Sequence, residues 1–215
     1  MARRRVAVLI SGSGSNLQAL IDRSVQPEAS FEIVHVLSNI ASAFGLERAR
    51  LAGIATSVVD HRGFDSRQHF DRAVGLALQE TGAELVCLAG FMRILGAELV
   101  EAWADRMLNI HPALLPSFKG LHTHERALAA GVRLHGCTVH VVRPALDDGP
   151  IVVQGVVPVL AADDPALLAK RVMEVEHRAY PLALDLLASG RAVVTGETVR
   201  VDPGFPSVIV HPSLA

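Results

Sequence analysis

The sequence predicts an α/β fold: a Rossmann-like, mostly parallel sheet with helices on both faces and antiparallel strands in its C-terminal half. Two observations support this class. Short apolar segments alternate with amphipathic segments through residues 5–111, as in parallel sheets whose strands are connected by helices. Two later apolar segments are separated by a short turn that contains Asp-Asp-Gly-Pro, and this spacing permits an antiparallel hairpin.

The first half opens with a strand, a glycine-rich turn and a helix, over residues 5–10, 11–16 and 17–24. The same alternation continues to residue 111. It predicts strands at 31–37, 54–59, 85–89 and 108–111, and helices at 43–52, 64–81 and 97–104. Gly53 and Gly82 stand where glycine commonly ends a helix, and Asp65 or Ser66 can cap the helix at 64–81.

The second half has fewer helices and more paired strands. It predicts a helix at 123–130, strands at 137–142 and 151–159, a helix from Pro165 to Ser189 bent at Pro181, and a terminal hairpin at 191–201. The proline-rich residues after it are expected to be irregular. We expect one domain over 1–215, with a phosphate-binding or nucleotide-binding half at about 1–105, a catalytic half at about 106–190, and the hairpin and tail at 191–215.

Composition points to small-molecule substrates. Half of the 215 residues are hydrophobic, the formal net charge is -2, and the 20 basic residues are scattered, so we expect no nucleic-acid partner. Arg3–Arg5 precede only five apolar residues, too few for an export signal, and no apolar run is long enough to span a membrane. We therefore expect a cytoplasmic protein. Cys87 and Cys137 lie in apolar strands and are expected to be inert thiols.

Asn109 and His111 are the strongest candidates for catalysis. They lie two positions apart on a predicted strand, so both side chains leave the same face. An amide that donates to a developing oxyanion, beside an imidazole that moves a proton, suits acyl transfer. The alternative is that the two residues are a hydrogen-bonded pair at the end of a strand and have no catalytic role. A carboxylate partner for His111 is expected from Asp147 or Asp148, although turn aspartates often serve only nearby backbone N–H groups.

The glycine-rich turn indicates an anion site, since such turns present backbone N–H groups and a helix N-terminus. It lacks the third glycine and the later acidic residue of a dinucleotide fingerprint, so a monophosphate is favoured over a nucleotide cofactor, and a purely structural turn stays possible. The ten histidines suggest zinc only weakly, because no Cys pair or His-Glu-x-x-His motif accompanies them, and we expect no metal. Residues 112–123 are expected to form a mobile loop over the site.

These motifs together resemble the phosphoribosylglycinamide formyltransferases, over residues 6 to about 190. The resemblance rests on Ile10–Leu17, Phe44–Arg50, Phe64–Arg67, Leu88–Leu95, Leu108–Pro112, Gly120–His124, Leu146–Asp147 and Glu176–His177. It implies transfer of a formyl group from 10-formyltetrahydrofolate, as co-substrate, to the amine of phosphoribosyl glycinamide in de novo purine biosynthesis. The same fold would then comprise a nucleotide-binding half and a folate-binding half. A monomer or a homodimer is compatible with this resemblance.

The resemblance also implies roles for individual residues. Asn109, His111 and Asp147 would be catalytic. The glycinamide substrate would contact Gly14, Ser15, Asn16, Met173 and Glu176. The folate would contact Arg67, Met92, Arg93, Ile94, Leu95, Asn109, Arg143, Pro144, Ala145, Leu146 and Asp147.

The chain departs from the family pattern at Ala113, Asp148 and Met173. The first two alter loop geometry and local charge, and the third implies that the phosphate relies more on backbone N–H groups. Because related motifs occur in other folate enzymes, a formyltetrahydrofolate deformylase is an alternative, as is a non-catalytic module that binds a phosphate ligand.

Overall fold

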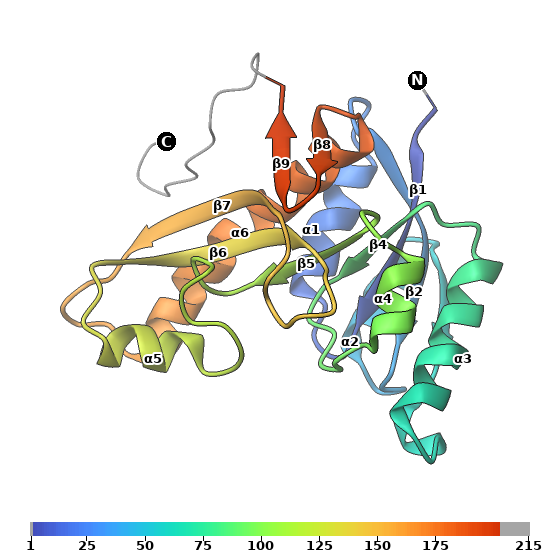
Figure 1. Ribbon diagram of the computed structural model, residues 1–215, viewed down its shortest axis with the longest axis horizontal. Coiled ribbons are helices and arrows are strands. Elements are labelled where there is room, and N and C mark those ends of the chain that lie inside the picture. The colour runs from blue at the N-terminus through green and yellow to red at the C-terminus, as the bar shows by residue number, and fades with distance from the viewer. Residues whose placement is uncertain (1, 203–215) are drawn as a thin grey trace. The chain divides into compact units, whose positions relative to one another are not determined.

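The computed structural model describes residues 2–202 of the chain (Figure 1). The predicted irregular tail after the terminal hairpin lies outside the described residues. The described residues form two compact units: residues 2–109 with 142–144, and residues 110–141 with 145–202. The strand at Met107–His111 contributes to both units, because the division falls after Asn109.

The first unit is an alternation of strands and helices that begins at the N-terminus. Its elements are β1 (Arg4–Ile10), α1 (Ser15–Ser24), β2 (Phe31–Ser38), α2 (Phe44–Leu51), β3 (Ala55–Val58), the 3₁₀ turn η1 (His61–Gly63), α3 (Arg67–Glu80), β4 (Leu85–Leu88), α4 (Ala97–Ala102) and β5 (Met107–His111). The strands pair in parallel in the order β3-β2-β1-β4-β5. The carboxyl ends of parallel strands meet at one edge of a sheet, which is where ligands of such folds bind.

Apolar periodicity explains how the helices of this unit pack. In α3, Phe70, Val74 and Leu78 recur at the spacing of one helix face, and all three are buried. They join one core cluster with Ala7 and Leu9 of β1 and with residues of β4 and α4. Fully burying a side chain of this size stabilises the fold by about 1.5–3 kcal/mol.

The second unit is built around an antiparallel strand pair and one long helix. Its elements are α5 (Thr123–Ala129), β6 (Leu134–Val141), β7 (Ile151–Pro158), α6 (Pro165–Ala188), β8 (Ala192–Thr195) and β9 (Thr198–Val201). Strands β6 and β7 pair antiparallel, and α6 lies along them (Figure 1). The approach is close: a Cβ at Gly155 of β7 would lie 2.2 Å from Cγ1 of Val175. Only glycine therefore lets this helix pack here.

The strand order over the described residues, β3-β2-β1-β4-β5-β6-β7, confirms the predicted fold class: a mostly parallel sheet with antiparallel strands in the C-terminal half. The terminal hairpin is confirmed as the antiparallel pair β8–β9. Both cysteine thiols are buried as predicted. Burial, together with the negative charge of Glu176, raises the pKa of Cys137 to about 12, so this thiol stays protonated.

Most elements begin or end one to three residues away from the predicted positions, as three of them illustrate. Helix α3 begins at Arg67 rather than at residue 64, because the Ser66 hydroxyl accepts the His69 N–H and caps the helix there. Strand β6 begins at Leu134, three residues before the predicted start. Helix α4 ends at Ala102 rather than at residue 104. Within residues 2–202, none of the helices combines the length and the apolar character needed to cross a bilayer.

Candidate active site

His111 closes strand β5 and is 6% exposed. Asn109 lies two residues earlier on the same strand, so alternation directs both side chains to one face. Inside the second unit, the chain after His111 is anchored to β6 by Thr138, whose hydroxyl donates to the Ala113 carbonyl at 2.7 Å and accepts the Leu115 N–H at 3.0 Å. This anchoring holds the end of β5 in a defined position.

Asp147 meets His111 inside the second unit. Their closest atoms, Asp147 Oδ2 and His111 Nδ1, are 3.5 Å apart, and each side chain is 7% exposed. The same oxygen accepts the Gly120 N–H at 2.9 Å. Asp147 has a positive φ of 49°, an uncommon backbone conformation for a residue other than glycine. The turn after β6 therefore holds the carboxylate against the imidazole in a strained but fixed position.

The other ring nitrogen of His111 faces a carbonyl group. Nε2 lies 3.0 Å from the oxygen of Phe118, and because a carbonyl only accepts, Nε2 must carry the hydrogen. Nδ1 faces the Asp147 carboxylate, which also only accepts when ionised. An imidazolium protonated at both nitrogens satisfies both oxygens. The arrangement thus suits a histidine that holds a positive charge beside an anion.

A second histidine flanks the same carboxylate. His140 on β6 is 2% exposed, and its Nε2 is 3.9 Å from Asp147 Oδ1. Burial lowers the pKa of His140, while the Val141 carbonyl and the Asp147 charge act in the opposite direction. Sequence reasoning did not assign His140 to this site. The available signal was its place near the end of the strand that leads into the turn with Asp147, seven residues before that carboxylate.

Residues 118–120 belong to the segment expected to cover the site, and they contact both members of the pair. Phe118 contacts His111 and Gly120 contacts Asp147 through the backbone groups described above, while Lys119 forms an ion pair with Asp148. Asp148 is thus turned to Lys119 rather than to His111. Phe118 has a φ of 56°, strained for a bulky residue. Mobility of residues 112–123 stays a prediction.

His124 and His135 form a second histidine cluster in this unit. Their rings pack edge to face with centroids 5.3 Å apart, and His135 is 1% exposed. Burial, reinforced by the charge of His124, lowers the pKa of His135 to about 4, so the ring is neutral near pH 7. Among residues 2–202, no three His, Cys, Asp or Glu side chains gather in an arrangement that could hold a metal ion.

The glycine-rich turn lies in the first unit, between β1 and α1. Gly14 is the N-cap of α1 with a φ of 71°, and no side chain caps the helix. Ser15 and Asn16 form its first turn, so their backbone N–H groups are oriented as in anion sites. A Cβ at Gly14 would lie 2.6 Å from the Cα of Gly45, which explains why glycine is needed here.

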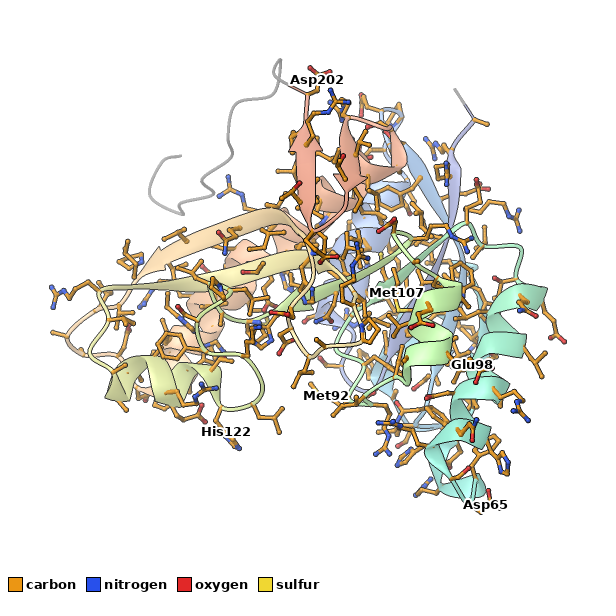
Figure 2. The ribbon with its side chains drawn as sticks, in the orientation of Figure 1. Asp65, Met92, Glu98, Met107, His122 and Asp202 are labelled. Atoms are coloured by element: carbon orange, nitrogen blue, oxygen red, sulfur yellow. The ribbon has the colours of Figure 1, made fainter. Side chains whose placement is uncertain are left out.

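The residues expected to contact folate divide between the two units. In the first unit, Met92 and Ile94 are 70% and 60% exposed, and Figure 2 labels Met92. Arg143 donates to Asp105 at 2.8 Å in the same unit, which also holds Arg67, Arg93, Leu95 and Pro144. The second unit holds Ala145, Leu146 and Asp147.

The remaining predicted substrate residues lie on helix α6 of the second unit. Met173 is 38% exposed, and Glu176 is buried. Of the residues predicted to be catalytic, the structure brings His111 and Asp147 into contact, with Asn109 two residues before His111.

Comparison with known proteins identifies the class of protein to which this fold belongs. Residues 4–184 match the formyl transferase family, so the chain belongs to that family. Membership implies a formyl donor as co-substrate.

Individual relatives narrow the class. The chain is 48% identical over 186 residues to a phosphoribosylglycinamide formyltransferase of Escherichia coli, an alignment that covers 86% of this chain and 88% of that protein. A crystal structure of glycinamide ribonucleotide transformylase 1 from Symbiobacterium toebii has a TM-score of 0.90 at 46% identity, with 93% of this chain and 94% of that chain covered. Within the formyl transferases, the chain therefore belongs with the phosphoribosylglycinamide formyltransferases.

Other relatives are much longer. The human trifunctional purine biosynthetic protein adenosine-3 is 51% identical over 199 residues, which cover 93% of this chain but 20% of that protein. The chain spans 14–20% of the length of the trifunctional relatives that it matches.

Proposed function

We propose that this chain transfers the formyl group of 10-formyltetrahydrofolate to the amine of phosphoribosyl glycinamide, a step of de novo purine biosynthesis. The observation that carries the proposal is the buried contact between His111 and Asp147, at the end of a strand that also carries Asn109. Its relatives of similar length bear the name of this activity.

The reaction replaces one carbon–nitrogen bond by another. The neutral amine attacks the formyl carbon, and the resulting tetrahedral oxyanion collapses with cleavage of the bond to N10 of the folate. The amine loses one proton and N10 gains one, so no oxidant, reductant or hydrolytic water is consumed. Much of the acceleration comes from holding the two substrates in the reacting orientation.

Asn109, His111 and Asp147 have different roles in this step: two stabilise the negative charge, and the third transfers the proton. Asn109 donates its amide hydrogen to the developing oxyanion, and protonated His111 stabilises the same negative charge. Asp147 sustains the charge on His111 and passes the amine proton, through water, toward N10. The Phe118 carbonyl, 3.0 Å from Nε2 of His111, accepts the hydrogen on that nitrogen, so His111 acts on the oxyanion through its positive charge rather than by donating this hydrogen.

Binding of the glycinamide substrate is assigned to two elements. The phosphate rests on the N–H groups of Ser15 and Asn16 at the uncapped start of α1, where the helix dipole favours an anion. Met173 offers no polar group, so these backbone donors carry more of the phosphate binding. Glu176 accepts hydrogen bonds from the ribose hydroxyls.

Binding of the folate is assigned to the segment at 92–95 and the segment at 143–147, with Arg67 and Arg93 as basic neighbours. The exposed apolar side chains of Met92 and Ile94 supply a surface for a flat ring. Arg67 and Arg93 suit the carboxylates of the folate tail. We further propose that the enzyme acts in the cytoplasm. We also propose that it is a monomer or a homodimer, two states that light scattering distinguishes by mass.

One absorbance experiment tests the function. The purified protein is mixed with 10-formyltetrahydrofolate, and release of tetrahydrofolate is followed with and without phosphoribosyl glycinamide. Release that depends on the glycinamide supports the transferase. Release without it identifies a deformylase, and no release under either condition leaves a binding module; both of these results contradict the proposal.

A further inference from the structure

Ser11, the residue directly after β1, bonds to two other parts of the first unit. It is 7% exposed, and its hydroxyl donates to Asn39 Oδ1 at 2.6 Å while accepting the Met92 N–H at 2.8 Å. The backbone N–H of Ser11 donates to the Gly90 carbonyl at 3.1 Å. One residue therefore makes two hydrogen bonds to the segment that follows β4.

The strand order explains why Ser11 reaches this segment. Strand β1 lies between β2 and β4, so the residue after β1 stands at one sheet edge beside Asn39, which follows β2, and Gly90, which follows β4. Residues 90–95 are neither helix nor strand. Phe91 and Leu95 are buried and anchor the segment, whereas Met92 between them is exposed (Figure 2). The Ser11 hydroxyl thus makes a side-chain hydrogen bond that fixes the backbone at Met92.

Asn39 determines where the Ser11 hydroxyl points. Asn39 is 1% exposed, and its Nδ2 lies 3.1 Å from Nδ1 of His61 in η1; in the tautomer in which this nitrogen accepts, the contact holds the carboxamide with Oδ1 toward Ser11. A serine hydroxyl has a single hydrogen. Since that hydrogen is donated to Asn39, the oxygen lone pairs are left to accept the Met92 N–H.

The rest of the glycine-rich turn, residues 12–16, has contacts that do not involve this hydroxyl. The Gly12 carbonyl accepts the Gly45 N–H at 3.0 Å, and the Ser13 carbonyl accepts Nε of Arg48 at 2.9 Å. Removing the Ser11 hydroxyl would leave both of these bonds in place. The hydroxyl and the turn can therefore be separated by mutation.

We propose that Ser11, oriented by Asn39, is a positioning residue for the folate side of the reaction: it fixes the backbone at Met92 and with it the exposed surface of Met92, Arg93 and Ile94. This inference rests on the proposed function, which makes that surface a folate contact. It predicts a selective effect on folate binding, not on phosphate binding or on the chemical step.

The test compares Ser11→Ala with Ser24→Ala. Ser24 is a matched control, because it is also buried and its hydroxyl donates to a backbone carbonyl, that of Ile21, at 2.8 Å near the end of α1. For Ser11→Ala we expect the KM for 10-formyltetrahydrofolate to rise up to about tenfold, the scale of one lost hydrogen bond. The kcat and the KM for phosphoribosyl glycinamide should stay within about twofold of the wild type, and Ser24→Ala should change none of the three.

Two readouts do not need turnover. The Kd of tetrahydrofolate, measured by calorimetry, should rise in Ser11→Ala by the same factor as the KM. Amide hydrogen exchange at Met92 should become faster, while exchange in β1 stays unchanged. If Ser11→Ala does not fold, Asn39→Ala is measured in its place. It should also raise the KM for 10-formyltetrahydrofolate selectively, but by a smaller factor.

An unchanged KM and Kd for the folate in Ser11→Ala would overturn the inference, as would an equal loss in kcat and in both KM values. These results differ from failure of the proposed function. That function fails when the wild-type protein shows no transfer, whereas the inference alone fails when the wild type transfers formyl groups and Ser11→Ala does so equally well.

Discussion

His111 and Asp147 form a buried pair, with 3.5 Å between Nδ1 and Oδ2 and 7% of each side chain exposed. Interactions between charges are much stronger in such a poorly hydrated place than at the surface. The Gly120 N–H satisfies the same carboxylate oxygen at 2.9 Å. The pair is therefore built to hold opposite charges close together, which is what stabilisation of an oxyanion by an imidazolium needs.

Asp147→Asn should lower kcat for formyl transfer by about 10³-fold, within the usual range for loss of an acid or base group. The amide keeps the shape of the carboxylate and can still accept the Gly120 N–H, so the fold should be retained. Steady-state kinetics and circular dichroism check the two parts. Asp148→Asn is the control, because Asp148 is 56% exposed and pairs with Lys119. It should retain kcat within a few-fold, and a loss equal to that of Asp147→Asn would contradict the assignment.

Gly14→Ala should damage the proposed phosphate site. Its backbone has a φ of 71°, and the added Cβ would lie 2.6 Å from the Cα of Gly45, a backbone atom that cannot swing away. We expect a loss of about 1–3 kcal/mol in the free energy of unfolding. The KM for phosphoribosyl glycinamide should rise at least tenfold.

Gly12→Ala is the matched control for that prediction, because nothing lies within 4 Å of a Cβ added at Gly12. Urea denaturation and kinetics on both variants provide the comparison. If the two variants had equal stability and an equal KM for phosphoribosyl glycinamide, the close approach of Gly14 to Gly45 would have no role in binding, and the prediction would be wrong.

Asp163→Asn should destabilise the second unit. The Asp163 side chain is 2% exposed and accepts two hydrogen bonds from the Arg171 guanidinium, at 2.7 and 2.8 Å. The hydrogen bonds from Arg171 lower the pKa of Asp163, so the stabilisation is present above the ordinary carboxyl range and is lost as the pH falls through the lowered pKa. We expect a loss of about 1–3 kcal/mol at pH 7.

The difference between wild type and Asp163→Asn should shrink below pH 4, which denaturation curves at several pH values can measure. Asp65→Asn serves as the control, since the Asp65 side chain is 80% exposed and its stability effect should stay within about 0.5 kcal/mol. A constant difference at all pH values would argue against the charge-assisted pair.

His135 should make the protein less stable in mild acid. Its pKa is lowered from 6.5 to about 4, chiefly by burial, so between these values the unfolded chain binds a proton that the folded chain does not. The stability present above pH 6.5 should fall by up to about 3 kcal/mol as the pH approaches 4. His135→Phe should flatten this dependence in urea denaturation, whereas His122→Gln should not, because the His122 side chain is 75% exposed. Equal slopes in wild type and His135→Phe would refute the prediction.

Periodicity was enough to predict the order and type of nearly all elements, because the apolar spacing of strands and helices is set by burial over many residues. Boundaries depend on single contacts. The Ser66 hydroxyl moves the start of α3 to Arg67, and the preceding η1 turn depends on the Asp60 side chain accepting the Arg62 N–H. Such caps compete with neighbouring candidates, and the amino-acid pattern does not decide between them.

The sequence was enough to predict which residues belong to the candidate site, but not which contacts they make. Asp147 was named because it follows a strand and matches a family motif, yet its approach to His111 joins residues 36 positions apart and depends on a positive φ at Asp147. The Phe118 carbonyl requires a second positive φ that a bulky residue rarely adopts. Unlike the glycine-rich turn, residues 118–120 carry no motif that marks their backbone groups, so neither the Phe118 carbonyl nor the Gly120 N–H could be foreseen.

A double-mutant comparison tests most directly the claim that His111 and Asp147 act together in formyl transfer. Values of kcat would be measured for the wild type, His111→Ala, Asp147→Asn and the double variant, all with phosphoribosyl glycinamide present. If the two residues act as one unit, kcat should fall strongly in each single variant and should fall little further in the double variant. Near-normal turnover in either single variant, or losses that multiply in the double variant, would contradict the account.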